Sequence, residues 1–315
     1  MSSAYLMAYF TSETHADGEQ IRFAVSDPGN PLRWTPLADG APILRSTVGE
    51  HGVRDPFLLW DDARSRYVIL ATDLRVHTDG NWHRAVRTGS RALVVWESPD
   101  LVNWSEPRLV TVAPDSAGNT WAPKAFRDPE RGVWTVIWAS ALFDDHDDRT
   151  RGTHQRLLAA DTTDFAEFTP ARIYFDPGHD VIDATFIHED QAWFRFSANA
   201  HAPGNPAHIG HHIYAERGTA LEDPNYTAVA IDVGRPELER GEGPAVFQSA
   251  DGTMSYLLID EFNLRGYQLF ELETARLDTG AWRHLPSAEL PPGARHGSVI
   301  PIPLDRRDEM IRRFR

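Results

Sequence analysis

Apolar residues gather along the chain in short segments, some alternating with polar residues and some continuous. The clearest segments span residues 67–71, 133–138, 193–196, 256–259 and 267–272. Turn-forming Asp, Gly and Pro residues separate them, and none shows the 3.6-residue period of an amphipathic helix. The pattern predicts strands joined by hairpins, with helix only in a short charged tail at about 305–315.

An internal repeat defines the expected architecture more tightly than any single segment. One marker is a polar turn that runs into an aromatic residue, and its five copies end at Trp34, Trp104, Phe168, Tyr226 and Trp282. A second marker opens a hairpin, and the positions taken as equivalent in it are Asp55, Ala122, Asp183, Glu242 and His296. Two independent markers thus give the same count of five repeats.

Repeats of this length, each holding about four short strands, match the blades of a propeller around a central channel. We therefore predict an all-β protein, a five-bladed β-propeller, in which residues 1–315 form a single domain. The N-terminal strand around residues 6–10 is expected to complete the last blade and close the ring. The innermost strands would then turn the equivalent residues toward the channel mouth.

Composition and charge limit the classes of molecule that the protein is expected to bind. With 41% hydrophobic residues and 10 Trp, the chain can bury a large core and still present aromatic surface to a ligand. A net charge of −15 disfavours nucleic acid and anionic membranes, whereas a neutral carbohydrate fits this field. The absence of cysteine excludes disulfides and cysteine nucleophiles. No secretion signal or membrane span is visible, so we expect a cytoplasmic location unless a signal was trimmed.

Three carboxylates at equivalent positions of separate blades point to acid–base chemistry. Asp55, Asp183 and Glu242 would repel one another in a partly desolvated channel and would raise each other's pKa. Hydrolysis of a glycosidic bond needs such a set, with one protonated acid at the leaving oxygen and one ionised carboxylate. The competing interpretation is turn chemistry, in which Asp-Pro and Glu-Gly-Pro merely cap local amides. Turn formation does not explain acids in one repeat register.

The ordered set of motifs resembles glycoside hydrolase family 43 over nearly the full chain. The motifs are Gly52-Val53-Arg54-Asp55-Pro56, Trp121-Ala122-Pro123, Ile182-Asp183, Glu242-Gly243-Pro244 and Arg295-His296-Gly297-Ser298. The resemblance implies a five-bladed propeller that hydrolyses by single-displacement inversion. It also implies arabinofuranosidase, xylosidase or galactofuranosidase activity, and we rank exo-acting α-L-arabinofuranosidase first. β-D-Galactofuranosidase and β-D-xylosidase remain the alternatives.

Carried over by position, the resemblance makes Asp55 the general base, Glu242 the general acid and Asp183 the carboxylate that tunes the pKa of the acid. The residues expected around the bound sugar are Arg54, Trp121, Arg265 and His296. In some relatives the histidine that matches His296 lies near a bound calcium or other ion. We expect a hydrogen-bonded structural histidine here, and the scheme requires no metal or other cofactor.

Two further clusters of metal-ligating residue types are expected to be rim loops of the substrate pocket. One is a histidine cluster without clean ligand spacing, at His201, His208, His211 and His212. The other lacks the glycine and terminal glutamate of a calcium loop, and it comprises Asp144, Asp145, Asp147 and Asp148.

Two other functions remain open at this stage. A retaining propeller that acts on fructosides also carries an Arg-Asp-Pro motif, but its Asn-Asp-Pro and Glu-Cys segments are absent here. A non-catalytic glycan-binding propeller is the alternative from another class, since fold alone does not establish chemistry. An assay with aryl glycosides separates a glycosidase from a binding module, because a binding module shows affinity without turnover. The oligomeric state is left open.

Overall fold

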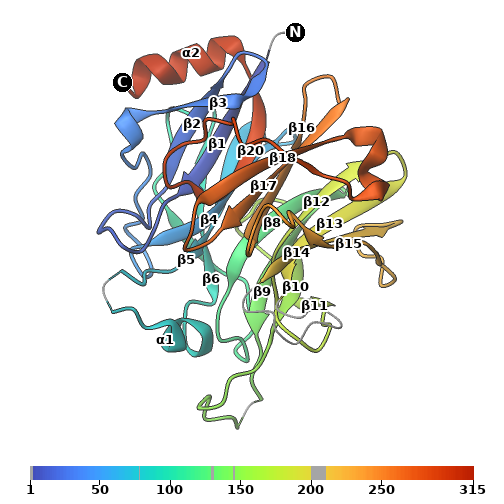
Figure 1. The fold of residues 1–315 in the computed structure, drawn as a ribbon. Coiled ribbons are helices and arrows are strands. Elements are labelled where there is room, and N and C mark those ends of the chain that lie inside the picture. Colours follow the sequence, from blue (N-terminus) through green and yellow to red (C-terminus); the bar gives the residue numbers. More distant parts are fainter. Residues whose placement is uncertain (1–2, 78, 129–130, 145, 200–210) are drawn as a thin grey trace.

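The strands form five antiparallel sheets of four strands each, arranged as the blades of a propeller (Figure 1). The structure is a computed structural model that describes residues 3–77, 79–128, 131–144, 146–199 and 211–315. The innermost strands contact one another in the order β4, β8, β12, β16, β20 and back to β4. The predicted all-β, five-bladed propeller is therefore confirmed.

Each blade runs from an innermost strand to an outermost one. One blade contains β4 (Val53–Asp61), β5 (Arg66–Asp73), β6 (Ala92–Ser98) and β7 (Arg108–Thr111). The next contains β8 (Trp121–Asp128), β9 (Val133–Ala141), β10 (Gln155–Thr162) and β11 (Arg172–Phe175). The third contains β12 (Val181–Glu189), β13 (Ala192–Asn199), β14 (His212–Gly218) and β15 (Thr227–Val233). The fourth contains β16 (Glu242–Gln248), β17 (Met254–Glu261), β18 (Gly266–Glu273) and β19 (Arg283–His284).

The fifth blade joins the two ends of the chain. It contains β20 (Arg295–Pro303), β1 (Ser3–Phe10), β2 (Arg22–Asp27) and β3 (Asn30–Pro36). The antiparallel register of β1 and β20 places Leu6 opposite Ile300 and Met7 opposite Val299, and Figure 1 shows these blue and red strands side by side. The predicted closure of the ring by the N-terminal strand is thus confirmed.

The core lies between neighbouring blades, because each sheet packs on both of its faces. Strand β9 is buried at every position after Val133, and β17 at every position after Met254. A strand buried on both faces carries a continuous apolar run and not an alternating one. This explains why residues 133–138 and 256–259 show no alternation in the sequence.

Each innermost strand carries the same irregularity close to its first residue. The pairing register shifts there, and one residue adopts a left-handed backbone. These residues are Asp55 (φ 52°), Ala122 (φ 52°), Asp183 (φ 58°), Gly243 (φ 54°) and His296 (φ 41°). Left-handed conformations at residues other than glycine are strained, and they cluster at functional sites.

The bulge corrects one predicted equivalence. The fourth copy of the left-handed position is Gly243, not Glu242, which occupies the position before it. Matching acid with acid shifted this blade by one residue, whereas the backbone aligns Pro244 with Pro56 and Pro123. Glu242 therefore corresponds in register to Arg54, Trp121, Ile182 and Arg295.

Helix is confined to short segments. The predicted C-terminal helix is α2 (Leu304–Arg313), while α1 (Trp82–Arg87), between β5 and β6, was not predicted. Two 3₁₀ turns, η1 (Ala38–Gly40) and η2 (Thr274–Thr279), complete the described elements. Neither α-helix in the described part of the chain has the length and apolar character needed to cross a membrane.

A serine links the closing strand to the neighbouring blade. Oγ of Ser298 accepts from the Leu58 amide at 2.8 Å and donates to the Pro56 carbonyl at 2.9 Å. Ser298→Ala leaves both buried backbone groups unpaired, so we expect the free energy of unfolding to fall by about 1–3 kcal/mol. Urea unfolding measures this change. Exposed Ser287 is the control site. A Ser298→Ala effect as small as that of Ser287→Ala would show that the link is dispensable.

Candidate active site

The five bulges surround a small pocket at one end of the channel. The pocket has a volume of about 190 Å³ and receives side chains from all five innermost strands. Its lining residues are Arg54, Asp55, Leu74, Trp82, Trp121, Ile182, Asp183, His211, Glu242 and His296. The structure thus brings together six of the seven predicted site residues, all but Arg265.

His296 lies at the centre of the carboxylates. Its Nδ1 is 3.0 Å from Oδ1 of Asp55 and 3.7 Å from Oδ2 of Asp183. Its Nε2 is 3.0 Å from Oε1 of Glu242 and 3.2 Å from Oδ2 of Asp260. One imidazole ring therefore faces four acidic side chains, two at each nitrogen.

Asp260 and Arg295 support this centre, and sequence reasoning gave neither of them a role. Asp260 is fully buried and pairs with Glu242 in the β16–β17 register. The guanidinium of Arg295 donates from Nε to Asp260 at 2.6 Å and from Nη2 to Glu242 at 2.8 Å. An acid at the end of the apolar run 256–259 was the available sequence signal for Asp260.

The charges at the two sides of the ring follow from these contacts. Burial lowers the pKa of His296, but the carboxylates around it, Asp183 and Glu242 foremost, raise that pKa well above its ordinary value. Burial raises the pKa of Asp55, but the contact with His296 and the charge of Arg54 outweigh burial and lower it to about 2. At neutral pH the site holds an imidazolium beside an ionised Asp55.

The other two carboxylates differ from each other. Burial raises the pKa of Asp183, the Asp55 and Glu242 charges raise it further, and the opposing charge of His296 does not reverse this. Burial also raises the pKa of Glu242, but His296 and Arg295 overcome it and hold that pKa below its ordinary value. The surroundings of Asp183 thus favour its protonated form, whereas those of Glu242 favour its ionised form.

Hydrogen bonds fix the orientation of the two aspartates. Oδ2 of Asp55 accepts from Oγ1 of Thr72 at 2.6 Å, and the same hydroxyl accepts from the Ala122 amide at 2.8 Å. Oδ2 of Asp183 accepts from the Gly243 amide at 2.9 Å. The left-handed positions of neighbouring blades are thus connected to the carboxylates, which are held in place before any ligand arrives.

Aromatic residues form the wall of the pocket. The guanidinium of Arg54 lies 4.7 Å from the ring centroid of Phe10 and 4.9 Å from that of Trp82. Trp82 meets Trp121 edge to face, with centroids 6.2 Å apart. Trp121 in turn packs against the small cluster of Leu74, Val76 and Ala85. Trp82 itself is 41% exposed and was not predicted, because it lies on the unpredicted α1.

Arg265 lies outside this pocket, contrary to expectation. It follows β17, and its guanidinium donates from Nε to Glu261 and from Nη2 to the Glu237 carbonyl. These contacts hold it away from the carboxylates. The arginine that contacts Glu242 is Arg295 instead.

The two clusters expected at the rim have different positions. His211 lines the pocket, whereas the side chain of His212 contacts Arg235. His201 and His208 lie outside the described residues. Asp144 and Asp147 line a separate hollow, so this loop does not shape the carboxylate pocket, and Asp145 also lies outside the described residues. Asp148 accepts from the Thr150 amide and hydroxyl.

Three of the site residues have the donor types of a metal site. Asp183, Glu242 and His296 each offer a ligand atom, and these atoms lie within 4.8 Å of one another. Metal binding would require a neutral imidazole nitrogen. The surrounding carboxylates favour the protonated ring, whose two nitrogens both face acids. The residues as they stand fit an imidazolium held by carboxylates better than a metal centre.

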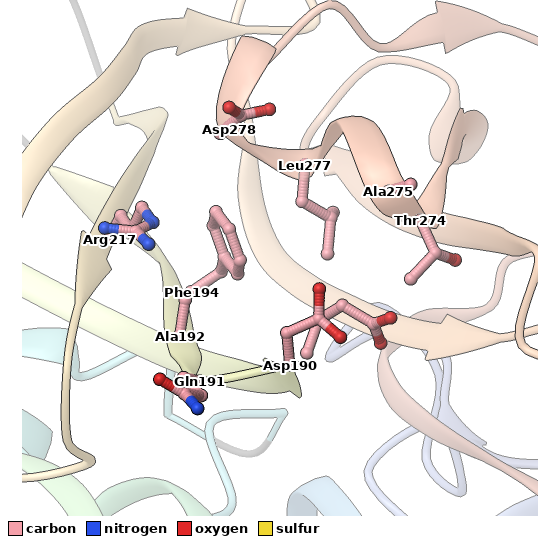
Figure 2. Close-up of a pocket in the computed structure, with 10 residues that line it drawn as sticks. Asp190, Gln191, Ala192, Phe194, Arg217, Thr274, Ala275, Leu277 and Asp278 are labelled. Carbon is pink, nitrogen blue, oxygen red and sulfur yellow. The ribbon is translucent and has the colours of Figure 1, made fainter.

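A larger hollow of about 630 Å³ lies elsewhere in the protein (Figure 2). Phe194, Arg217, Leu277 and Asp278 surround it together with the β12–β13 turn. Asp183 lies near the first residue of β12, whereas this turn follows the last, so the hollow is remote from the carboxylates. Chemistry rather than size therefore identifies the candidate active site.

Comparison with known sequences links the chain to glycoside hydrolases. A family model described as a probable glycosyl hydrolase domain, related to family 43, matches residues 1–308. An α-L-arabinofuranosidase of Bifidobacterium longum subsp. longum is 28% identical over 241 residues, which cover 72% of this chain and 22% of that protein. The chain therefore spans only about a fifth of the length of this relative.

Solved structures show the same fold. A thermostable family-43 glycoside hydrolase is 19% identical, with a TM-score of 0.56 and 80% of each chain covered. The catalytic domain of a Coprinopsis cinerea family-62 α-L-arabinofuranosidase is 17% identical, with a TM-score of 0.51, covering 78% of this chain and 71% of that one. The predicted family resemblance is confirmed by the family model, which covers nearly the whole chain. The protein belongs to the family of probable glycosyl hydrolase domains related to glycoside hydrolase family 43.

Proposed function

We propose that residues 1–315 act as one catalytic domain that removes terminal furanosyl or pentosyl units by inversion, with α-L-arabinofuranosides as the first candidate substrates. The observation that carries this proposal is the set of buried carboxylates around one imidazolium at the end of a small pocket. At about 190 Å³ the pocket is smaller than the roughly 300–1,000 Å³ typical of drug-sized ligands. It suits a single sugar ring, which supports exo action.

The base in this proposal is Asp55. Its pKa of about 2 keeps it ionised at neutral pH, as a group that accepts a proton from water must be. Thr72 holds one of its oxygens, and His296 lies beside the other. Water placed between Asp55 and the sugar loses its proton to Asp55 while its oxygen attacks the anomeric carbon.

The acid in this proposal is Glu242, which must be protonated when the glycosidic bond breaks. In the free protein it is ionised beside the imidazolium, with Nε2 of His296 only 3.0 Å from Oε1. A bound sugar displaces water, and desolvation disfavours a charge-separated pair relative to its neutral form. A proton then passes from His296 to Glu242 and on to the leaving oxygen.

The placement of the two groups supports inversion. Asp55 and Glu242 face opposite nitrogens of one imidazole, each at 3.0 Å, so the ring and both contacts separate them. Retaining enzymes need carboxyl groups about 5–5.5 Å apart, and inverting enzymes need roughly 6.5–9.5 Å to admit water. The arrangement favours the wider spacing. The family relationship and the arabinofuranosidase relative support the same reaction class.

The base assignment predicts a large loss of activity in Asp55→Asn. This change removes the proton acceptor for water but keeps the side-chain volume, so the rate should fall by about 10²–10⁴-fold. A panel of aryl α-L-arabinofuranosides, β-D-galactofuranosides and β-D-xylosides measures the rate and identifies the sugar. Asp62→Asn, at an exposed position after β4, is the control. Asp55→Asn activity within a few-fold of the control would contradict the assignment.

The acid assignment predicts dependence on the leaving group. Glu242→Gln should slow hydrolysis of oligosaccharides far more than that of aryl glycosides with acidic phenols, because only poor leaving groups need protonation. Asp55→Asn should slow both alike. The ratio of the two activities at saturating substrate measures the difference. Because Asp183 has the raised pKa, Asp183→Asn tests the competing assignment. A stronger leaving-group dependence in Asp183→Asn would identify Asp183 as the acid.

Because Trp82 is the exposed part of the pocket wall, we predict that it helps to bind the leaving sugar. Trp82→Ala should raise KM for arabino-oligosaccharides severalfold and leave KM for methyl arabinofuranoside unchanged, as expected for an aromatic contact of about 0.5–1.5 kcal/mol. Trp60→Ala is the matched control, since Trp60 is also 41% exposed and lies at the far end of β4. Equal effects on both substrates would exclude this role for Trp82.

A further inference from the structure

Lys124 is the only lysine of the chain, and it is buried next to the candidate active site. The chain has 31 lysines and arginines together, and every one except Lys124 is arginine. Its side chain is on the innermost strand β8, and the residue is only 3% exposed. A chain that otherwise uses arginine throughout thus places its single compact ammonium at a position closed to solvent.

The position of Lys124 in the propeller is defined by the repeat. Three residues after the bulge opens, the other innermost strands carry uncharged residues, which are Phe57, Thr185, Ala245 and Ser298. In the ring, β8 lies between β4 and β12 and contacts both strands. These two strands carry Asp55 and Asp183. Lys124 is therefore the only charged residue at these five equivalent positions, and it lies between the blades that supply the two aspartates.

The ammonium of Lys124 makes few direct contacts. Nζ donates to the Pro123 carbonyl at a long 3.4 Å and lies 5.6 Å from the ring centroid of Phe57. Among the described residues, no carboxylate lies within 4.0 Å of it. Burial lowers its pKa below the ordinary value of a lysine, and the charges of Asp55 and Asp183 offset only part of this effect. A buried charge of this kind persists only where opposite charges compensate for lost hydration.

We propose that Lys124 is a positioning residue whose charge adds to those of His296 and Arg54 in keeping Asp55 ionised, without occupying the lone pairs of Asp55. A direct arginine–carboxylate pair would engage both carboxylate oxygens, whereas a compact ammonium at a distance leaves them free for water. Oδ1 and Oδ2 of Asp55 already meet His296 and Thr72. The effect of Lys124 on catalysis rests on the proposed function. The charge coupling between Lys124 and Asp55 does not depend on it.

The catalytic part of the proposal is tested by the pH dependence of kcat/KM in Lys124→Met. Methionine keeps most of the length but removes the charge, so the pKa of Asp55 rises and the acidic limb moves to higher pH. An opposite charge nearby lowers a carboxyl pKa by about 1–3 units, and we expect a shift of about one pH unit. Thr185→Val, at the equivalent position of β12, is the uncharged control and should leave the limb in place. A limb that Lys124→Met leaves unmoved overturns the proposal.

A second measurement needs neither activity nor a Lys124 variant. Because the chain has one lysine, ¹³C-lysine labelling gives a single side-chain NMR signal, and its titration reports the pKa of Lys124 directly. In the Asp55→Asn protein the midpoint should fall below that of the unsubstituted protein, since one compensating charge is gone. Asp62→Asn should leave it unchanged. An equal midpoint in Asp55→Asn refutes the coupling, even if the protein proves to be a glycosidase. If the midpoint is lower in Asp55→Asn but the unsubstituted protein hydrolyses no glycoside, the coupling stands and the proposed function is refuted.

Discussion

The site depends on one buried imidazolium. His296 contacts Asp55 and Asp183 through one side of its ring and Glu242 and Asp260 through the other. Without its positive charge, four carboxylates from three blades would repel one another in a poorly solvated space. With it, the two ring nitrogens define where each acid lies. The distance between Asp55 and Glu242, on which the proposed inversion depends, is thus set by the ring.

The fold delivers this arrangement through a backbone irregularity and not through loops. Each innermost strand bulges close to its first residue, and three of the left-handed residues there, Asp55, Asp183 and His296, line the pocket. Four of the five left-handed residues are not glycine, so the surrounding sheet must hold them in a strained conformation. Closure of the ring by β1 and β20 contributes to this, because β20 carries both Arg295 and His296. Stability of the last blade and geometry of the site are therefore linked.

Repetition made much of this predictable from the sequence, and its limits explain the failures. Five copies of two markers gave the blade count, and Asp55, Asp183 and His296 followed from their register. Glu242 lies in the predicted pocket but one position before the left-handed residue, because a sequence shows which residues are acids and does not show where the backbone bulges. Features outside the repeat gave no such signal. α1 carries Trp82 in an insertion, and Asp260 lies on a second strand.

The charges of the site impose opposite pH demands on the fold. The pKa of Asp55 is lowered in the folded protein, so its contribution to stability is present above the unfolded pKa of about 3.9 and is lost as pH falls toward about 2. The pKa of His296 is raised, so its contribution is present below about 6.5 and is lost as pH rises through the folded value.

Asp183 acts in the other direction, because a raised carboxyl pKa means that its ionised form is less favourable in the folded protein than in the unfolded chain. Its cost therefore appears as pH rises from the unfolded pKa through the folded one, while the contributions of Asp55 and His296 are still present. The fold tolerates the unfavourable charge of Asp183 because Asp183 faces Nδ1 of His296, where the charges of His296 and Asp55 are both favourable. The proposed acid–base chemistry needs that combination, in which a carboxyl group that favours its protonated form lies beside an ionised carboxylate.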